Sequence, residues 1–400
     1  MTTPTDTAPD RYSYWQTAPL SIAGSRVLVA TKPGVFAHGT VDPATMMLAE
    51  QMASLGRSTS VHLNSGNGLV AAAAAVAGGA SVLWCSDRSL PSVQATERTL
   101  KANGVAGGHV IHAHGTHRFP LATASDVVTI RVSTDKVALQ QLIWEAFHAL
   151  RVGGKCYIAG ANDEGVKPAV RLLESIFGAA RLEAQHSGHR MAVATKNQIA
   201  PSSLTEGTSP YLDPEHFRAV PITLHGLAHT LYSRPGVFSW EHLDEATQIL
   251  GDLMDVRAGE SVLDLGSGAG ALGLTAAALS GTGRVLMVDA DAEAVRCVSR
   301  GIATAELANA EVRASDVGGA VGDERFDVVV SNPPFHQGKA TDLMVPRQFI
   351  ADAYTHLKVG GRLMLVANRT LPYEQVIADR FGDVRTLHDG RRFKVLGATR

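Results

Sequence analysis

The residues with the most distinctive chemistry follow a buried apolar run and read Ser-Asn-Pro-Pro-Phe-His, residues 331–336. Pro333 and Pro334 fix φ and remove two N–H donors, so the carbonyl groups before them have no ladder partner. The amide oxygen of Asn332 and the carbonyl oxygen of Pro333 would then form a rigid acceptor pair at the carboxyl edge of a sheet, where open α/β folds bind ligands. Such a pair suits a planar exocyclic amine, whose delocalised lone pair must be directed before it can attack.

An aromatic residue, Phe335, comes next and predicts a ring that stacks on the same planar group. No strong general base is expected, because the proton leaves only after the amine has reacted. The alternative interpretation is a Pro-Pro loop that simply ends a strand. The predicted catalytic residues are Asn332, Pro333 and Phe335, and the other predicted substrate contacts are Pro334, His336 and Gly338.

A glycine-rich turn, Asp264-Leu-Gly266-Ser-Gly268-Ala-Gly270, lies upstream between a short apolar run and an Ala/Leu-rich helix. Glycines allow a sharp turn and a close approach to a ligand, and the helix N-terminus that follows favours a carboxylate or phosphate. Asp289 ends the next apolar run, where an acid can bind both hydroxyls of an adenosine ribose. NAD and FAD proteins use similar turns, and a structural turn is the simplest alternative. The dinucleotide spacing fits less well, because residue 271 is alanine.

The acid-first form of this turn resembles the S-adenosylmethionine loop of class I methyltransferases. In that family a polar residue after the third strand contacts adenine, and Ser315 and Asp316 match this position, with helix capping as the alternative role. Asn332 is expected to lie against the cofactor as well. The resemblance implies that the methionine part is held by Asp264, Gly266, Gly268 and Gly270, and the ribose by Asp289.

The elements that position these residues occur twice. PGVF at 33–36 recurs at 235–238, a shift of 202 residues, and Asp42 and Thr45 recur in the same register as Asp244 and Thr247. AFHALRVGGKCYIAG (146–160) likewise corresponds to AYTHLKVGGRLMLVA (353–367). A fixed register over this length indicates that the two halves are copies of one fold.

Each half alternates short apolar runs with helical segments, which predicts a parallel sheet covered by helices on both faces. We therefore expect an α/β protein with two tandem Rossmann-like domains that arose by duplication. The predicted domains are 1–198 and 217–400, joined by a Pro/Ser/Thr-rich linker at 199–216. A hairpin is predicted over 221–232. In the second half the predicted strands are 261–265, 284–288, 326–330, 362–367 and 393–396, with a helix near 348–357.

The first half lacks the predicted chemistry. Its counterpart of the glycine turn reads His62-Leu-Asn64-Ser-Gly66-Asn-Gly68, so the acid has become histidine and the first glycine has become asparagine. Arg131-Val132-Ser133 occupies the place of Asn-Pro-Pro. We expect neither a cofactor turn nor an acceptor array to survive there. The first half is predicted to be a degenerate copy that binds RNA or supports the second half.

Composition sets the general class. The chain has 400 residues, 45% of them hydrophobic, and a net charge of −2, so no overall basic field attracts nucleic acid. Residues 1–200 hold 17 Lys and Arg against 13 Asp and Glu, a balance of +4, and residues 201–400 hold 19 against 25, a balance of −6. Any polyanion is thus expected to contact mainly the first half.

Several kinds of site are not expected. The three cysteines are isolated, which predicts no disulfide and fits a reducing cytoplasm. The histidines at 109–117 have no acid or cysteine nearby and predict a polar loop with no metal. The Ala-rich run 69–85 is interrupted by Gly78-Gly79 and predicts a helix followed by a strand, not a membrane span. The polar N-terminus has no signal-peptide pattern.

Over nearly the whole chain, and most densely over 235–398, the sequence resembles the RsmC/RlmG family of bacterial ribosomal RNA guanine-N2 methyltransferases. The resemblance implies S-adenosylmethionine as methyl donor, S-adenosylhomocysteine as product, and a guanine of ribosomal RNA, most of all 16S, as an unstacked target. The segments that carry it are PGVFS (235–239), LDLGSGAG (263–270), SNPPFHQG (331–338), FIADAYTHLKVGGRL (349–363), VANRTLPYE (366–374) and FKVLGA (393–398).

The expected protein is a cytoplasmic monomer that acts on ribosomal RNA or an assembled ribosomal subunit, with no membrane or DNA partner. Two alternatives stay open. The same acceptor pair would serve methylation of a glutamine amide in a protein, and a ribosome assembly factor could bind RNA while keeping only a vestigial cofactor pocket.

Overall fold

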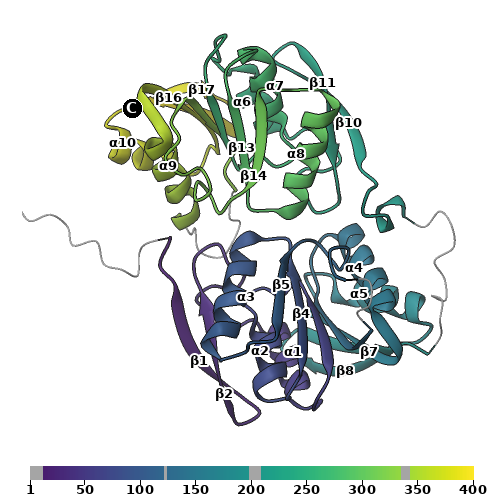
Figure 1. Cartoon of the computed structure of the whole chain (residues 1–400). Coiled ribbons are helices and arrows are strands. Elements are labelled where there is room, and N and C mark those ends of the chain that lie inside the picture. The colour runs from purple at the N-terminus through teal and green to yellow at the C-terminus, as the bar shows by residue number, and fades with distance from the viewer. Residues whose placement is uncertain (1–11, 121–123, 198–208, 335–342) are drawn as a thin grey trace, which may run out of the picture. The chain divides into compact units, whose positions relative to one another are not determined.

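A computed structural model of the chain describes residues 12–120, 124–197, 209–334 and 343–400. The chain divides into two compact units, Ser13–His216 and Phe217–Arg400, and the latter also includes Tyr12. They are coloured purple to teal and green to yellow in Figure 1. Most of the predicted linker, 199–208, lies outside the described residues. In the part of the chain that is described, no helix has both the length and the apolar character needed to cross a membrane.

The second unit is an α/β domain with a mixed seven-stranded sheet. The sheet consists of β12 (Val262–Leu265), β13 (Val285–Asp289), β14 (Ala310–Ala314), β15 (Phe326–Ser331), β16 (Leu357–Asn368), β17 (Arg385–Asp389) and β18 (Phe393–Thr399). Two further strands of this unit, outside that sheet, are β10 (Arg218–Leu224) and β11 (Leu227–Ser233). Its helices are α6 (Glu245–Asp252), α7 (Ala271–Ser280), α8 (Ala292–Thr304), α9 (Met344–His356) and α10 (Tyr373–Phe381).

The sheet has the strand order β14-β13-β12-β15-β16-β18-β17, with β10 and β11 forming a separate hairpin as predicted. The first five strands of that order run parallel. β18, however, pairs antiparallel with both β16 and β17. The expectation of a purely parallel sheet is therefore wrong at this edge, because the short connection between β17 and β18 makes a hairpin instead of a helical crossover.

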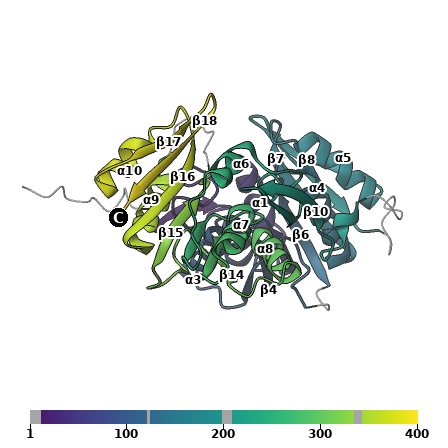
Figure 2. The same ribbon diagram turned by 90° about the horizontal axis from the view of Figure 1, so that it is seen from above.

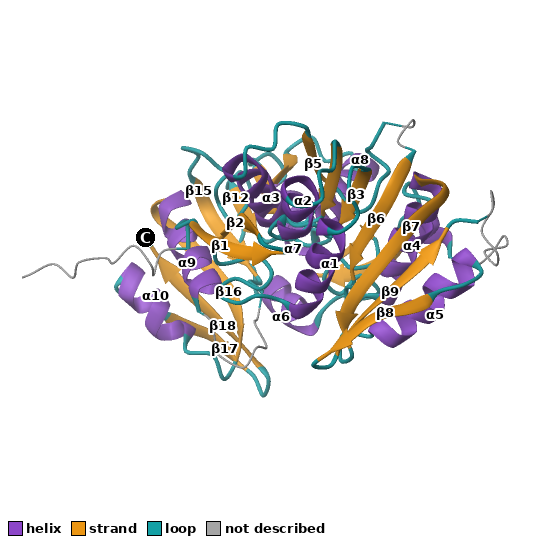
Figure 3. Cartoon of the chain, turned by 90° about the horizontal axis from the view of Figure 1, so that it is seen from below, coloured by secondary structure: helices purple, strands orange, loops and turns teal. Residues whose placement is uncertain are grey.

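Alternate residues of the central strands enter two different cores. Val262 of β12 joins a core with α6, α7 and α8, whereas Leu263 joins one with α9 and α10. Helices thus cover both faces of the sheet, as Figures 2 and 3 show for this unit. Because both faces are buried, the strands are apolar throughout, which is why their positions could be predicted from the sequence.

The first unit repeats this architecture, with the order β5-β4-β3-β6-β7-β9-β8 and its own hairpin, β1 with β2. Its strands are β1 (Gln16–Ile22), β2 (Ser25–Thr31), β3 (Thr59–Leu63), β4 (Val82–Asp87), β5 (Gly108–His112), β6 (Ser125–Arg131), β7 (Leu150–Ala161), β8 (Arg181–His186) and β9 (His189–Thr195). Its helices are α1 (Pro43–Ala53), α2 (Leu69–Val76), α3 (Leu90–Ala102), α4 (Lys136–Ala149) and α5 (Val166–Phe177).

Strand register relates the two units residue by residue. His62 pairs with Thr129 in the first sheet, and Asp264 pairs with Val330 in the second. Two positions further along, Arg131 therefore corresponds to Asn332. The sequence alignment of the two halves and the register of the two sheets agree, so differences at these positions are differences of side chain.

Candidate active site

The carboxyl ends of three adjacent parallel strands bring the predicted site residues together. β12 lies between β13 and β15, so the glycine turn, Asp289 and the segment after Ser331 meet at one edge of the sheet. The hydroxyl of Ser331 donates to the carbonyl of Leu265 at 2.8 Å, which joins the start of that segment to the start of the turn. Segments more than 60 residues apart in sequence are thus held in one place.

The glycine turn needs its glycines. Gly266, Gly268 and Gly270 all have positive φ, of 75°, 53° and 88°, a region that other residues rarely enter. A Cβ on Gly266 would also lie 3.0 Å from the Phe349 ring, and one on Gly270 would lie 3.0 Å from Val298. Gly270 then starts α7. The turn is therefore set both by backbone conformation and by close packing.

Asp289 is fixed beside this turn. One carboxylate oxygen accepts the Gly268 N–H at 2.7 Å, and the other accepts the Asp291 N–H at 2.9 Å. The side chain is partly exposed at the strand end. A carboxylate in this place can bind the hydroxyls of a ribose that lies over the turn.

Two buried polar atoms of the turn have no hydrogen-bond partner in the described part of the chain. Asp264 is fully buried and accepts the Gly273 N–H at 2.9 Å through one oxygen, while its other oxygen, like the hydroxyl of Ser267, is unpartnered. Burial raises the pKa of Asp264 to about 7, the Gly273 N–H lowers it, and the charge of Asp289 raises it further. Unpartnered buried polar groups are costly in a folded protein and are typical of places where a ligand completes the bonding.

Asn332 is held by the first turn of α6. Its amide nitrogen donates to the carboxylate of Asp244 at 3.2 Å and to the hydroxyl of Thr247 at 2.9 Å. Since Asp244 can only accept, the nitrogen must face it, and this sets the orientation of the amide. The amide oxygen of Asn332 is buried and has no hydrogen-bond partner among the residues that the structure describes. The side chain therefore presents one oriented acceptor.

Asp244 and Thr247 were not among the predicted site residues. Asp244 also starts α6, because its carboxylate accepts the Thr247 N–H at 3.0 Å. The available signal was their recurrence in the repeat as Asp42 and Thr45, but a shared helix cap explains that recurrence equally well.

The remaining predicted residues divide into three groups. Pro333 is buried and Pro334 is exposed next to Asn332. The hydroxyl of Ser315 donates to the Val317 carbonyl and accepts the Ala320 N–H, so it is used inside its own loop. Asp316 accepts a hydrogen bond from Tyr12 at 2.6 Å, a contact across 304 residues that no sequence pattern predicted. Phe335, His336 and Gly338 lie outside the described residues.

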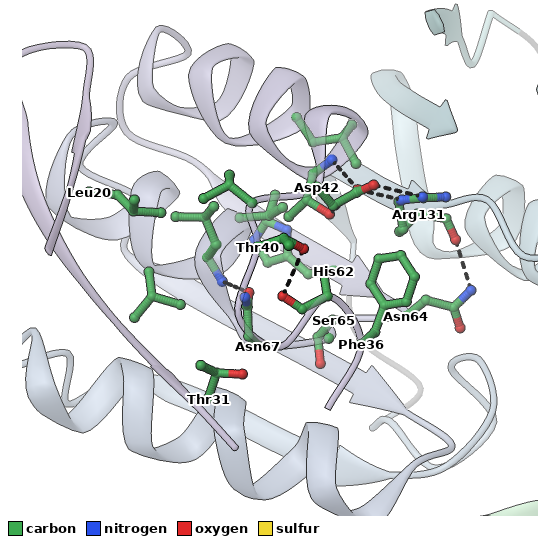
Figure 4. A pocket seen from close by; sticks show the side chains of 18 of the residues that line it. Leu20, Thr31, Phe36, Thr40, Asp42, His62, Asn64, Ser65, Asn67 and Arg131 are labelled. Atoms are coloured by element: carbon green, nitrogen blue, oxygen red, sulfur yellow. Dashed lines mark hydrogen bonds and ion pairs between the residues drawn. The ribbon is translucent and has the colours of Figure 1, made fainter. Parts of the chain in front are cut away.

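The first unit has a cavity of about 260 Å³ at the same edge of its sheet, shown in Figure 4. Asn64, Gly66 and Gly68 have φ of 54°, 58° and 77°, so the turn keeps its left-handed backbone. Asp87 ends β4 as Asp289 ends β13, and it accepts the N–H groups of Gly66 and Ser89, each at 2.9 Å. The prediction that no cofactor turn survives is wrong for the backbone, because asparagine tolerates positive φ better than most residues.

The side chains of that cavity bond to one another. Both ring nitrogens of His62 have hydroxyl partners, Thr129 at 2.8 Å and Ser60 at 3.0 Å, and burial lowers the pKa of His62 to about 3. Arg131 donates to Asp42, to Glu164 and to its neighbour's carbonyl (Figure 4 shows the Asp42 pair). None of the described residues that line the cavity has a buried, unpartnered polar side-chain atom.

Comparison with known proteins gives concordant results. The methyltransferase small domain family matches this chain twice, over residues 26–192 and 228–397. Ribosomal RNA small subunit methyltransferase C of Shewanella pealeana is 32% identical over 70% of this chain and 80% of that protein. The protein of the same name from Haemophilus influenzae is 39% identical over 42% of this chain, and this match spans half of that relative.

A solved structure is similar over nearly its full length. The 16S rRNA N2 methyltransferase RsmC of T. thermophilus, in complex with AdoMet and guanosine, aligns with a TM-score of 0.78 at 28% identity. The alignment covers 96% of this chain and 98% of that chain. The likeness extends through both units, so the duplicated architecture is shared and is not peculiar to this chain.

Proposed function

This chain belongs to the methyltransferase small domain family, together with the ribosomal RNA small subunit methyltransferase C proteins, and from that premise we propose that it transfers a methyl group from S-adenosylmethionine to the N2 amine of a guanine in 16S ribosomal RNA. The observation that supports this most directly is the amide of Asn332, which offers an oriented, buried and unpartnered oxygen next to the glycine turn. An N–H group of the substrate would supply the missing partner.

The residues at the turn fit the cofactor. Three glycines with positive φ bring the backbone close to a ligand, Asp289 is placed for ribose hydroxyls, and Asp264 and Ser267 carry unpartnered buried atoms. When bound, S-adenosylmethionine supplies an electrophilic methyl group on a sulfonium. Asp264, Gly266, Gly268 and Gly270 would hold its methionine part, and Asp289 its ribose.

The chain's own contribution to the reaction is orientation and hydrogen bonding. Asp244 and Thr247 hold the Asn332 amide so that its oxygen accepts one N–H of the target amine, and the Pro333 carbonyl accepts the other. These bonds strengthen as positive charge develops on the nitrogen, and a single preorganised group of this kind typically contributes about 10²–10³ in rate. The proton is released after transfer, so no buried base is required.

The first unit would have a different task. Arg131 offers only donors where Asn332 offers an acceptor, so the predicted degenerate domain, 1–198, would bind ribosomal RNA or support the catalytic domain, 217–400. The enzyme would act as a cytoplasmic monomer on naked RNA or on an assembled subunit.

Transfer of labelled methyl groups tests the proposal. The protein is incubated with labelled S-adenosylmethionine and, separately, with small subunits, naked 16S RNA or ribosomal proteins from cells that lack this protein. Digestion and mass spectrometry should find N2-methylguanosine in the RNA. Label on a protein glutamine would instead support the alternative substrate, and absence of label from every fraction would support a non-catalytic assembly factor.

A further inference from the structure

Tyr12 belongs to the second unit although it precedes the first unit in the chain. Only 8% of Tyr12 is exposed, and it packs in the same core as Val317, Val321 and Phe349. Its hydroxyl donates to an oxygen of Asp316 at 2.6 Å. A buried, hydrogen-bonded tyrosine from a distant part of the chain is therefore built into the loop that follows β14.

That loop adjoins the ribose end of the proposed cofactor site. The Ser315 N–H donates to the carbonyl of Asp289 at 2.8 Å, so Asp316 lies one residue beyond a direct backbone contact with the ribose acid. Asp352 supports the loop from α9 by accepting the Gly318 N–H at 2.8 Å. Burial and the charge of Asp316 raise the pKa of Tyr12, so its hydroxyl remains a donor throughout the physiological range.

We propose that Tyr12 is a positioning residue of the cofactor site, whose hydrogen bond and ring fix Asp316 in the orientation that accepts the adenine amino group. This rests on the proposed function, and on the adenine contact that the resemblance to class I methyltransferases implies for Asp316. The chain before the first unit would then contribute to cofactor affinity in the second. The chemical group that Asp316 would recognise is the exocyclic amine of adenine. An acceptor held at a fixed angle can bond to an amine at that position and cannot bond to a carbonyl there.

Cofactor affinity tests this inference separately from methyl transfer. In the full-length protein, Tyr12→Phe should weaken S-adenosylhomocysteine binding about 5–20-fold by calorimetry, since a hydrogen bond to a charged group is lost. KM for the cofactor should rise by a similar factor while kcat stays within twofold. Tyr14→Phe is the matched control, because Tyr14 is 43% exposed, and it should bind normally.

Two further measurements exclude a purely structural role. The Tyr12→Phe/Asp316→Asn double variant should bind no more weakly than Asp316→Asn alone, and the preference for S-adenosylhomocysteine over its deaminated inosyl analogue should shrink in Tyr12→Phe. Normal binding by Tyr12→Phe, additive losses in the double variant, or an unchanged preference would each overturn the inference. Lack of RNA methylation by the wild type would overturn only the proposed function.

A second, independent observation concerns the aromatic residue of the repeated PGVF segment. Phe36 and Phe238 occupy the same place in the two units, and both are strongly exposed, at 50% and 61%. The guanidinium carbon of Arg131 lies 5.1 Å from the Phe36 ring centre, and Figure 4 shows this ring beside Arg131 and Asn64. Since Arg131 corresponds to Asn332 in strand register, Phe238 is expected beside Asn332.

Contacts within the second unit support that placement. Val237 packs in one cluster with Ala269 of the glycine turn, and Asp244, six residues after Phe238, binds the Asn332 amide. The segment that carries Phe238 thus extends from the glycine turn to the acceptor. A phenyl ring that is 61% exposed gains little from burial in the protein, but it offers an aromatic face to a base at the mouth of the site.

The geometry points to Phe238 as a residue on which the target guanine stacks while Asn332 holds its amine. This deepens the proposed function, which it presupposes. Stacking on an aromatic side chain contributes substantially to binding of an unpaired base and tolerates exchange among aromatic rings. A structural role in folding of the segment would show no such tolerance.

Four variants test the stacking role, and the equivalent residue of the first unit, Phe36, serves as the control. Phe238→Ala should lower kcat/KM for RNA by about 10–100-fold and leave the cofactor Kd unchanged. Phe238→Trp should restore most of the activity and Phe238→Leu should not, while Phe36→Ala should stay within threefold of wild type. Equal activity of the Leu and Trp variants, or equal losses from Phe36→Ala and Phe238→Ala, would overturn it. An active Asn332→Ala variant would count against the proposed function instead.

Discussion

At the carboxyl edges of the two sheets the backbone follows the same course, but the polar side chains differ in whether they have hydrogen-bond partners. In the first unit His62 has partners on both ring nitrogens, and Arg131 is neutralised by Asp42 and Glu164. In the second unit, over the described residues 217–334 and 343–400, Asp264 and Asn332 each keep one buried oxygen without a partner. The polar side chains at the first edge bond to one another around its cavity, whereas the second edge offers unpartnered acceptors to a ligand's donors.

This difference shows how a duplicated fold can lose a reaction without losing its shape. Each unpartnered buried polar atom costs about 1–3 kcal/mol, so a unit without a ligand is stabilised when its site bonds to itself. The left-handed turn and Asp87 persist in the first unit because Asp87 holds the turn through the Gly66 N–H. Those features are structural, whereas the oxygens of Asp264 and Asn332 at the second edge are left available to a ligand.

The strongest test of the difference between the two sheet edges is to remove the acceptor oxygen of Asn332. Asn332→Ala should lower kcat by about 10²–10³-fold, because the oriented acceptor is lost, with the cofactor Kd within threefold of wild type. Single-turnover methylation of RNA and calorimetry measure the two quantities. The counterpart Arg131→Ala should destabilise its unit, since it removes the buried guanidinium that pairs with the partly buried acids Asp42 and Glu164, yet leave methyl transfer per folded molecule unchanged. A fully active Asn332→Ala enzyme would refute the assigned role.

Asp289, the acid proposed to bind the ribose, offers a second test with a matched residue in the first unit. Asp289→Ala should weaken cofactor binding about 10–100-fold, because charge-assisted hydrogen bonds to the ribose are lost. Asp87→Ala removes the same turn-holding bonds in the first unit and should leave cofactor affinity unchanged. If calorimetry gives the two variants equal affinities, the comparison fails at this position.

The smallest expected effect is a difference in pH dependence. Burial raises the pKa of Asp264 from 3.8 to about 7, so the unfolded chain loses this proton first and the second unit loses stability as pH rises from about 4 to 7. Burial lowers the pKa of His62 from 6.5 to about 3, so the unfolded chain gains this proton first and the first unit loses stability as pH falls below about 6.5.

Urea unfolding at several pH values measures both slopes, each at most about 1.4 kcal/mol per pH unit. Asp264→Asn should remove the loss of stability as pH rises from about 4 to 7, and His62→Gln should remove the loss as pH falls below about 6.5. A change of the opposite sign in either variant, or an unchanged pH dependence, would contradict the assignment of these opposite trends to the two buried groups.

Several features of the fold and site followed from the sequence for local reasons. Strands buried on both faces read as continuous apolar runs, so β12, β13 and β15 could be placed without a structure. β17 could not, because Arg385–Asp389 is mostly exposed and has no apolar pattern. The turn at Asn64 was misjudged because the loss of a glycine suggested a loss of the left-handed backbone.

The sequence by itself determined the duplication, the order of the elements and the two motifs that reach the sheet edge, because apolar periodicity, glycine and proline act on their own neighbours. Only the tertiary structure decided which atoms at that edge remain unpartnered. The bonds from Asn332 to Asp244 and Thr247 span 88 and 85 residues, and the bond from Tyr12 to Asp316 spans 304. Such bonds depend on how helices and loops pack against the sheet, and packing at a distance leaves no local pattern in the chain.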